Sequence, residues 1–315
     1  MKQNLCDPTC YYVNTRAVGD TIAAVPVVNY VIQNFHIPNK IPYRVQAPKS
    51  LRVFYDFVPD ENFLDVDDKL EGRWATCQLN APAHSSITRL TPMHVSLSHY
   101  SSLKFMDRIL PLTECNYLPL QKVDVSKFNL DFTRAVIICS TYRDTIRYWP
   151  VEEMIKVAEY VKASGHLPIF IGKEDFSKDT KTQLTKEDAG RYGIDLRNQT
   201  SLLELATLMG MAKAVVGLDS GPIHLAGTTS VPIICGYTSV APEYRIPVRR
   251  VGTTYVVAPD VSCKYCQSHW LLYYWDFGKC YLKHADCCKQ MTADKFIGYL
   301  SRLLCRYKVN NSPSR

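Results

Sequence analysis

The segment DSGPIHL, residues 219–225, constrains the fold of this chain more than any other, because short apolar runs flank it, Ala214 to Gly217 and Val231 to Gly236. This order predicts a strand, a tight turn, a helix and a second strand. Such a turn points the free N–H groups of the new helix outward from the carboxyl edge of a sheet, where a phosphate can bind. A nucleotide-type ligand is therefore the first hypothesis. Ser220 and Gly221 would supply N–H donors, and Asp219 would take a ribose hydroxyl or a cation. The alternative is that Asp219 or Ser220 only caps a helix.

The chain has 315 residues, enough for one large domain or two ordinary ones, and its 46% hydrophobic content is ample for buried cores. Its apolar runs are shorter than the roughly 18 residues that span a bilayer. The opening residues MKQNLCDP lack the hydrophobic segment of a signal peptide, so we expect a cytoplasmic protein. The net charge of +7 favours anionic partners, and part of it is local to Arg245, Arg249 and Arg250.

The second half of the chain alternates strand and helix patterns, which predicts a parallel sheet. Strands are expected at Ala135–Cys139 and Leu167–Ile171, with a helix opening at Trp149-Pro150 between them. A further helix is expected from Ser201 to Ala212, capped by Thr200 or Ser201. After Thr292 one helical face carries five apolar residues: Phe296, Ile297, Leu300, Leu303 and Leu304.

The first half is less regular. Tyr11 to Val13 followed by Thr21 to Phe35 predicts a strand entering a helix, which Pro26 should kink or delay. From Ile37 to Pro119 the pattern supports only an α/β half-domain with irregular loops. We place the domain boundary between residues 125 and 126, which gives domains 1–125 and 126–315.

Three motifs carry a resemblance to a known family. The segment 219–226, followed by Val231-Pro232 and Gly236-Tyr237-Thr238, resembles the donor-site signature of the lipopolysaccharide heptosyltransferases, glycosyltransferase family 9. The stretch RAVGDTIAAVP, residues 16–26, resembles the amino-terminal motif of that family, and STYRDTIRYWP, residues 140–150, matches a second motif. The resemblance implies an α/β protein of the GT-B type, with two Rossmann-like domains whose parallel sheets face each other across a cleft.

The resemblance also implies catalytic roles. Asp20 stands at the position of the family's proposed general base, which would take the proton of an acceptor hydroxyl as it attacks the donor sugar. Its alternative role is to cap the following helix. Arg147 stands where the family usually has a lysine that offsets charge on the leaving nucleoside diphosphate. The alternative for Arg143 and Arg147 is ordinary surface charge before a helix.

Further donor-binding residues are expected around these motifs. Ser140 and Thr141 follow the strand Ala135–Cys139 and can hydrogen-bond the phosphates or the acceptor. Glu174 would reach the nucleoside ribose by family analogy. With Asp219, Ser220 and Gly221 they complete the expected donor site. His224 is expected to be a packing or hydrogen-bonding residue without a catalytic role.

Five of the 12 cysteines lie between Cys263 and Cys288, and this cluster needs its own explanation. Four thiolates suit a tetrahedral structural zinc: Cys263, Cys266, Cys280 and either Cys287 or Cys288. His269 or His284 can substitute for one of them. Buried free thiols are the alternative. Catalysis itself is expected to need no cofactor, because Arg147 and a helix dipole can balance the leaving group.

Taken together, the motifs predict an inverting glycosyltransferase that moves heptose or a similar sugar from a nucleotide sugar, by family precedent ADP-heptose. The expected acceptor is a saccharide or glycolipid such as lipopolysaccharide core, with peripheral contact to the inner membrane through a basic face. Two alternatives stay open. One is a glycosyltransferase acting on modified DNA bases, which the basic charge permits. The other is a non-catalytic nucleotide-binding homologue.

Overall fold

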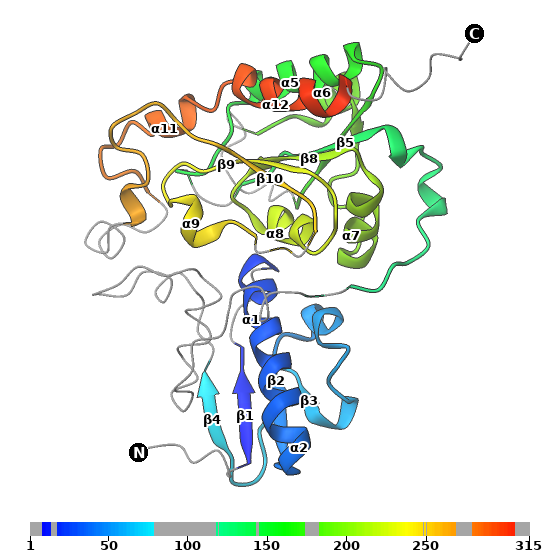
Figure 1. Cartoon of the computed structure of the whole chain (residues 1–315), viewed down its shortest axis with the longest axis vertical. Helices are drawn as coiled ribbons and strands as arrows, with labels where there is room; N and C mark the ends of the chain where they lie inside the picture. The colour runs from blue at the N-terminus through cyan, green and yellow to red at the C-terminus, as the bar shows by residue number, and fades with distance from the viewer. Residues whose placement is uncertain are drawn as a thin grey trace. The chain divides into compact units, whose positions relative to one another are not determined.

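The computed structural model describes residues 8–13, 18–78, 118, 120–142, 145–173, 183–247, 249, 251–268 and 279–305. The chain divides into two compact units, each built on a parallel sheet (Figure 1). Unit 1 comprises Met1–Leu120 and a return segment, Glu243–Arg250, while unit 2 comprises Gln121–Pro242 and Val251–Arg315. The boundary expected between residues 125 and 126 stays a prediction. The return segment is a feature that the sequence patterns did not indicate.

Unit 1 holds a four-stranded parallel sheet in the order β3-β2-β1-β4. Its strands are β1 (Thr9–Tyr12), β2 (Tyr43–Gln46), β3 (Phe63–Leu64) and β4 (Ala75–Gln78). Thr9 in β1 is level with Tyr43 of β2 on one side and Ala75 of β4 on the other. The chain therefore adds β2 and β3 on one side of β1 and then crosses to the other side. Such a reversal marks the place where open α/β sheets bind ligands, at the carboxyl ends of the strands.

One helical run connects β1 to β2. It consists of α1 (Val18–Val31), a π-helical turn (Ile32–His36) and α2 (Ile37–Asn39). The helix expected at Thr21–Phe35 is therefore longer than its sequence pattern indicates. The expectation that Pro26 delays the helix is wrong, because α1 begins at Val18 and Pro26 lies inside it. Its neighbours on both sides are buried, so packing compensates for the backbone hydrogen bond that proline removes. Two 3₁₀ helices, Lys49–Tyr55 and Asp60–Asn62, fill most of the connection from β2 to β3.

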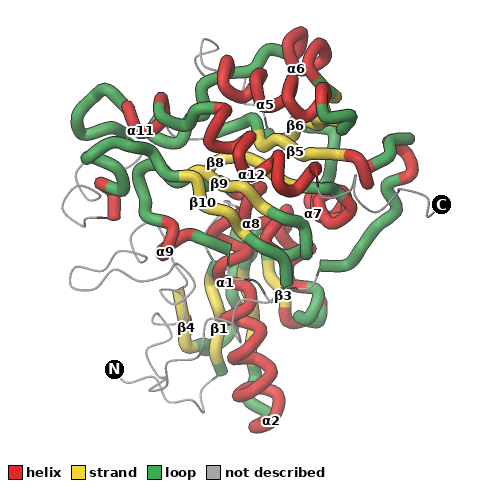
Figure 2. The backbone as a smooth tube through the Cα atoms, turned by 45° about the horizontal axis from the view of Figure 1, so that its top comes forward, coloured by secondary structure: helices red, strands yellow, loops and turns green. Residues whose placement is uncertain are grey.

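Unit 2 holds a six-stranded parallel sheet in the order β10-β9-β8-β5-β6-β7 (Figure 2). Its strands are β5 (Ala135–Cys139), β6 (Leu167–Ile171), β7 (Ile194–Asp195), β8 (Ala214–Leu218), β9 (Ile233–Gly236) and β10 (Thr254–Val257). The helices are α5 (Val151–Ala163), α6 (Lys186–Tyr192), α7 (Leu202–Met211), α8 (Gly221–Gly227), α11 (Asp286–Lys289) and α12 (Ala293–Cys305). Helix α9 (Pro242–Arg245) begins at the last residue before the return segment and otherwise belongs to that segment of unit 1. Short 3₁₀ turns lie at Ser126–Phe128, Phe132–Arg134 and Cys266–Ser268. The order again reverses at the first strand of the unit, between β5 and β8.

Helices cover both faces of this sheet, with α5, α6 and α12 on one face and α7 and α8 on the other (Figure 1). The apolar face expected for α12 is confirmed, because Phe296, Leu300 and Leu304 are buried in the core that α12 shares with α5. The structure also shows which of Thr200 and Ser201 caps α7. Ser201 is its N-cap and forms a reciprocal capping box with Glu204, which satisfies two backbone N–H groups that the helix leaves unpaired.

Candidate functional site

The residues predicted to bind a donor come together at the reversal point of unit 2. β5 pairs with β8 in parallel, Val136 level with Ala214, so the two strands end side by side. Ser140 and Thr141 follow the end of β5, and Asp219 and Ser220 follow the end of β8. The sequence predicted that each pair of residues follows a strand. The strand order in the sheet adds that these two strand ends are neighbours.

Asp219 is a buried carboxylate at this edge. Its residue is 4% exposed, with Oδ2 3.6 Å from Nη1 of Arg147 and Oδ1 3.4 Å from Nε2 of His224. Its backbone N–H donates to the carbonyl of Gly236 on β9. The carboxylate thus lies between the Arg147 guanidinium and the His224 imidazole, which come from different elements. The sequence predicted Arg147 and Asp219 in one site but did not predict that His224 contacts Asp219. The four-residue spacing of His224 from Ser220 on a helix start was the available signal.

Contacts on both sides of Arg147 hold its backbone in place. The hydroxyl of Thr238 donates to the carbonyl of Ile146 at 2.6 Å. The indole N–H of Trp149 donates to the carbonyl of Met291 at 2.8 Å. The Arg147 side chain is 21% exposed, so its guanidinium pairs with Asp219 and still reaches solvent. A ligand phosphate at this edge would meet a cation whose position the core already determines.

Helix α8 begins as the sequence predicts, with Ser220 as N-cap and Pro222 in the first turn. The side chain of Ser220 makes no capping bond, and its buried Oγ has no hydrogen-bond partner within the described structure. The role of an ordinary side-chain cap is therefore not the arrangement found. A buried hydroxyl without a partner costs free energy, which a ligand atom at this edge would relieve.

Ser140 and Thr141 are placed differently from each other. The Ser140 hydroxyl is buried and donates to the carbonyl of Ile171 at 3.1 Å. This hydrogen bond connects the ends of β5 and β6, so the hydroxyl proton is already used within the protein. Thr141 lies against Gly172, where a Cβ would stand 2.1 Å from the Thr141 Oγ1. Gly172 also has a φ of +146°, which side-chain-bearing residues rarely adopt. Glu174 lies outside the described residues.

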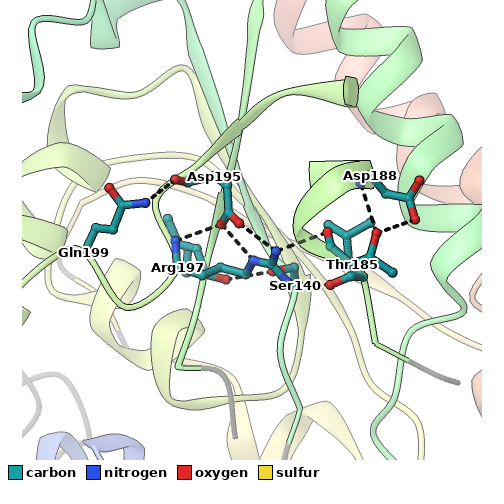
Figure 3. A network of polar contacts seen from close by, with 8 residues as sticks. Ser140, Thr185, Asp188, Asp195, Arg197 and Gln199 are labelled. Atoms are coloured by element: carbon teal, nitrogen blue, oxygen red, sulfur yellow. Dashed lines mark hydrogen bonds and ion pairs between the residues drawn. The ribbon is translucent and has the colours of Figure 1, made fainter. Parts of the chain in front are cut away.

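A polar network braces the same edge of the sheet beyond β6 (Figure 3). The guanidinium of Arg197 donates to both carboxylate oxygens of Asp195, each at 2.7 Å. It also donates to the carbonyls of Leu184 and Thr185. Arg197 is 5% exposed, so this is a buried and largely satisfied charge. The network ties β7 to the chain that enters α6.

The candidate base lies at the reversal point of unit 1. Asp20 is in the first turn of α1, directly after β1 in the chain, and its side chain is 22% exposed. It lies inside the helix, so the alternative that it precedes the helix as N-cap is not the arrangement found. Its Oδ1 is 4.0 Å from Nη1 of Arg245, which belongs to the return segment of unit 1. The sequence identified Arg245 only as local positive charge.

A hollow in unit 1 lies away from Asp20. It has a volume of about 410 Å³ and is lined by Lys40 of the turn that enters β2, by Arg44 in β2 and by Trp74 directly before β4. These residues lie at the amino ends of their strands, whereas Asp20 follows the carboxyl end of β1. The hollow and Asp20 are therefore at opposite edges of one parallel sheet.

The cysteines of the carboxyl-terminal cluster gather in unit 2 as free thiols. The pKa of Cys266 is raised to about 11, mainly by burial and also by negative charge on Cys287, Cys263 and Cys280. Burial also raises the pKa of Cys263, with Cys287 and Cys280 adding to the effect. These four thiols therefore share one neighbourhood. Cys288 is turned elsewhere: its thiol contacts Cys287, the backbone of Tyr148 and the Thr238 side chain.

The four thiols of this cluster are ligands that a soft metal ion prefers, but they are farther apart than the ligands of a bound metal ion. Four thiols without a carboxylate are typical of structural zinc or iron sites. Within the described ranges, no three His, Cys, Asp or Glu side chains stand close enough together to hold an ion. His269 lies outside the described residues, and His284 contacts Asp286 at 3.2 Å.

Comparisons with known proteins agree with this architecture. Residues 113–269 match the family model of glycosyltransferase family 9 (heptosyltransferase). Lipooligosaccharide heptosyltransferase 2 of Haemophilus influenzae is 28% identical over 107 residues, which cover 33% of this chain and 31% of that protein. The matched part is thus under a third of that relative's length.

Two solved structures extend the likeness to nearly the whole chain. A family 9 glycosyl transferase of Veillonella parvula has a TM-score of 0.67 at 15% identity, covering 97% of this chain and 99% of that one. The iron-containing dodecameric glycosyltransferase TibC of enterotoxigenic Escherichia coli has a TM-score of 0.73 at 17% identity, covering 96% and 77%. TibC is also known in complex with ADP-D-β-D-heptose. At these identities the structural likeness speaks for the fold alone.

Two parallel Rossmann-like sheets, each with polar residues at its reversal point, define an α/β protein of the GT-B class, as the sequence predicted. The family match then gives the narrower assignment. This chain belongs to glycosyltransferase family 9, the heptosyltransferase family, and the resemblance drawn from its motifs is confirmed.

Proposed function

We propose that this chain is an inverting glycosyltransferase that moves a sugar from a nucleotide-sugar donor to a saccharide hydroxyl. One observation carries the proposal: in a family 9 chain, Arg147, Asp219 and Ser220 meet at the reversal point of the unit 2 sheet. Ligands of open α/β sheets gather at such points. Asp20 at the equivalent point of unit 1 supplies a carboxylate that can take the proton of the acceptor hydroxyl.

The reaction follows from these groups. The carboxylate of Asp20 takes the proton of the acceptor hydroxyl while that oxygen forms a bond to the anomeric carbon of the donor. The bond from the anomeric carbon to the diphosphate oxygen breaks on the opposite face, and the nucleoside diphosphate leaves with the electron pair. A single displacement of this kind inverts the anomeric centre. Arg147 balances the charge that develops on the leaving diphosphate.

The donor residues take separate tasks. The partnerless hydroxyl of Ser220 and the N–H groups of Ser220 and Gly221 bind diphosphate oxygens. Asp219 holds Arg147 in place and is near enough to the same edge to take a donor hydroxyl. Thr141 donates to the ligand, whereas Ser140 contributes only if its hydroxyl turns from Ile171. Glu174 keeps its expected place at the ribose as a proposal from family analogy.

ADP-heptose is the donor that we propose, and a lipopolysaccharide-type core saccharide is the acceptor. The support is the ADP-heptose complex of TibC and the lipooligosaccharide heptosyltransferase relative. No described helix is long and apolar enough to cross a membrane. We place the reaction in the cytoplasm, where free thiols such as the eight described here persist, with contact to the inner membrane through the acceptor glycolipid.

The thiol cluster is proposed to hold a structural zinc through Cys263, Cys266, Cys280 and Cys287. Bound metal would draw the four thiols into a tetrahedron and join the turn at Cys263 to α11. Elemental analysis of the purified chain should find about one metal ion per molecule. Cys287→Ser should lose it while Cys288→Ser keeps it, because Cys288 faces Tyr148 and Thr238 instead. If the analysis finds iron instead of zinc, the proposed metal site stands and only the identity of the metal changes. A chain purified without any metal would refute the site.

The test of function is transfer from a panel of nucleotide sugars that includes ADP-heptose. Release of nucleoside diphosphate should require one donor and a saccharide acceptor, and Asp20→Asn should lower kcat by about 100-fold to 10,000-fold. Asp67→Asn, which changes an exposed carboxylate of unit 1, is the matched control and should leave kcat unchanged. Arg147→Lys should keep more activity than Arg147→Met, since both Lys and Arg carry the required charge.

Three results would contradict the proposal. Full activity of Asp20→Asn would remove the base from the mechanism. Transfer only to DNA, with steep loss of binding as salt rises, would favour the DNA-modifying alternative. Donor binding without turnover under every acceptor would leave a nucleotide-binding homologue.

A further inference from the structure

Arg245 is a buried cation that the mechanism above does not use. It closes α9 at the start of the return segment, and its side chain is 7% exposed. Arginine is rarely buried to this degree unless an anion is present. The anion here is Asp20, with Oδ1 4.0 Å from Nη1. The Nε of Arg245 has no hydrogen-bond partner within the described structure.

The separation of 4.0 Å decides what kind of interaction this is. A charge-assisted hydrogen bond between guanidinium and carboxylate would be about 2.7–2.9 Å long. At the longer distance Arg245 attracts the carboxylate without occupying Oδ1 through a direct N–H bond. Charges at about 4 Å still interact strongly where protein replaces water. Arg245 therefore favours the ionised form of Asp20 without itself donating a hydrogen bond to Oδ1.

We propose that Arg245 is the positioning residue of the candidate base, which keeps the Asp20 carboxylate ionised and oriented before the acceptor hydroxyl arrives. This inference rests on the proposed function, in which Asp20 takes the acceptor proton. The same positive charge opposes retention of that proton, so it also speeds the return of Asp20 to its carboxylate form after transfer. The cost is a weaker base, and the gain is a carboxylate that stays ionised at lower pH.

Arg249 is the other basic side chain of the return segment within the described residues. Burial lowers the pKa of Arg249 to about 10, so it stays protonated at neutral pH. Substitutions of the two arginines are expected to differ in their effect on Asp20, because the 4.0 Å contact with Asp20 is made by Arg245. If this contact sets the ionisation of Asp20, Arg245 variants must have a larger effect than Arg249→Met.

The experiment is a ¹³C NMR titration of the aspartate side-chain carboxyls in the full chain, with Asp20→Asn assigning the Asp20 signal. Arg245→Met and Arg245→Gln should each raise the titration midpoint of Asp20 by about 1–3 pH units, because the neighbouring positive charge is gone. Arg245→Lys should restore most of the wild-type midpoint. Arg44→Met, which removes a cation at the opposite edge of the sheet, should leave it in place. The acid limb of the pH profile of kcat/KM should move by the same amount.

The outcomes separate this inference from the proposed function. A shifted midpoint without sugar transfer would sustain the Arg245–Asp20 linkage and refute the transferase. A midpoint that moves by less than about 0.3 pH units in both neutral variants would overturn the role of Arg245, even where Asp20→Asn abolishes transfer. An equal shift in Arg249→Met would overturn it too. Two neutral variants of different shape guard against a folding defect in either one, which the amide spectrum of each would reveal.

Discussion

Replacing Arg197 by Met should destabilise unit 2 more than any surface charge change, because it breaks the buried network that braces β7. The guanidinium makes two bonds of 2.7 Å to Asp195 and two to backbone carbonyls, at Leu184 and Thr185. Methionine fills much of the same volume but donates nothing. The substitution therefore leaves two carbonyls without these donors, and the Asp195 carboxylate keeps the backbone N–H of residue 197.

The size of the effect follows from burial. Removing one partner of a fully buried ion pair costs about 3–5 kcal/mol. The Asp195 side chain is 19% exposed, so water can replace part of what it loses. We therefore expect the free energy of unfolding of unit 2 to fall by about 3 kcal/mol at pH 7. That is a large share of the stability of an ordinary domain.

The pH dependence of this loss has a definite sign. Burial acts to raise the pKa of Asp195, but hydrogen bonds and charge from Arg197 outweigh it, so the pKa is lowered from its usual 3.8. A carboxyl group with a lowered pKa stabilises the fold above its unfolded value and loses that contribution as the pH falls through the folded value. The cost of Arg197→Met should accordingly be full above about pH 5 and shrink below about pH 4.

Urea unfolding monitored by circular dichroism at several pH values measures this loss, with the transition of unit 2 fitted apart from that of unit 1. Lys156→Met is the matched control. It removes one exposed partner of the Lys156–Glu153 pair on α5 and should change the free energy of unfolding little, because water and salt screen such a pair. A loss from Arg197→Met no larger than that of the control, or one that does not change with pH, would refute the reasoning.

Two further predictions concern the backbone of unit 2. Gly172→Ala should destabilise the fold by about 1–3 kcal/mol in the same urea assay, since φ is +146° there and a Cβ would overlap Thr141; Gly165→Ala, also at positive φ but with open space around it, separates backbone strain from overlap. Ser201→Ala should cost about 1 kcal/mol by removing one half of the capping box of α7. Thr200→Ala is its control and should cost little, and equal losses in the two variants would contradict the assignment of Ser201 as the cap.

Much of unit 2 could be predicted from the sequence because its signals are local. β5 and β6 have the expected bounds, and α5 and α7 differ from theirs by a residue or two. Proline, acidic residues and a capping serine mark helix starts, and apolar runs mark buried strands. In unit 1 the same rules predicted too short a helix. Burial around Pro26 outweighs its intrinsic tendency to break helices, and burial is a property of the folded chain.

The order of the motifs, the class of fold and the family could be predicted from the sequence. The residues that favour turns and the spacing of apolar residues are properties of neighbouring positions in the chain. Tertiary structure decided which distant residues meet. Arg147 faces Asp219 because β5 and β8 are adjacent strands, and Arg245 faces Asp20 because a short segment returns to unit 1. Strand order and chain crossings depend on packing across the whole molecule, so the pairing of charges at the candidate site appears only once the chain is folded.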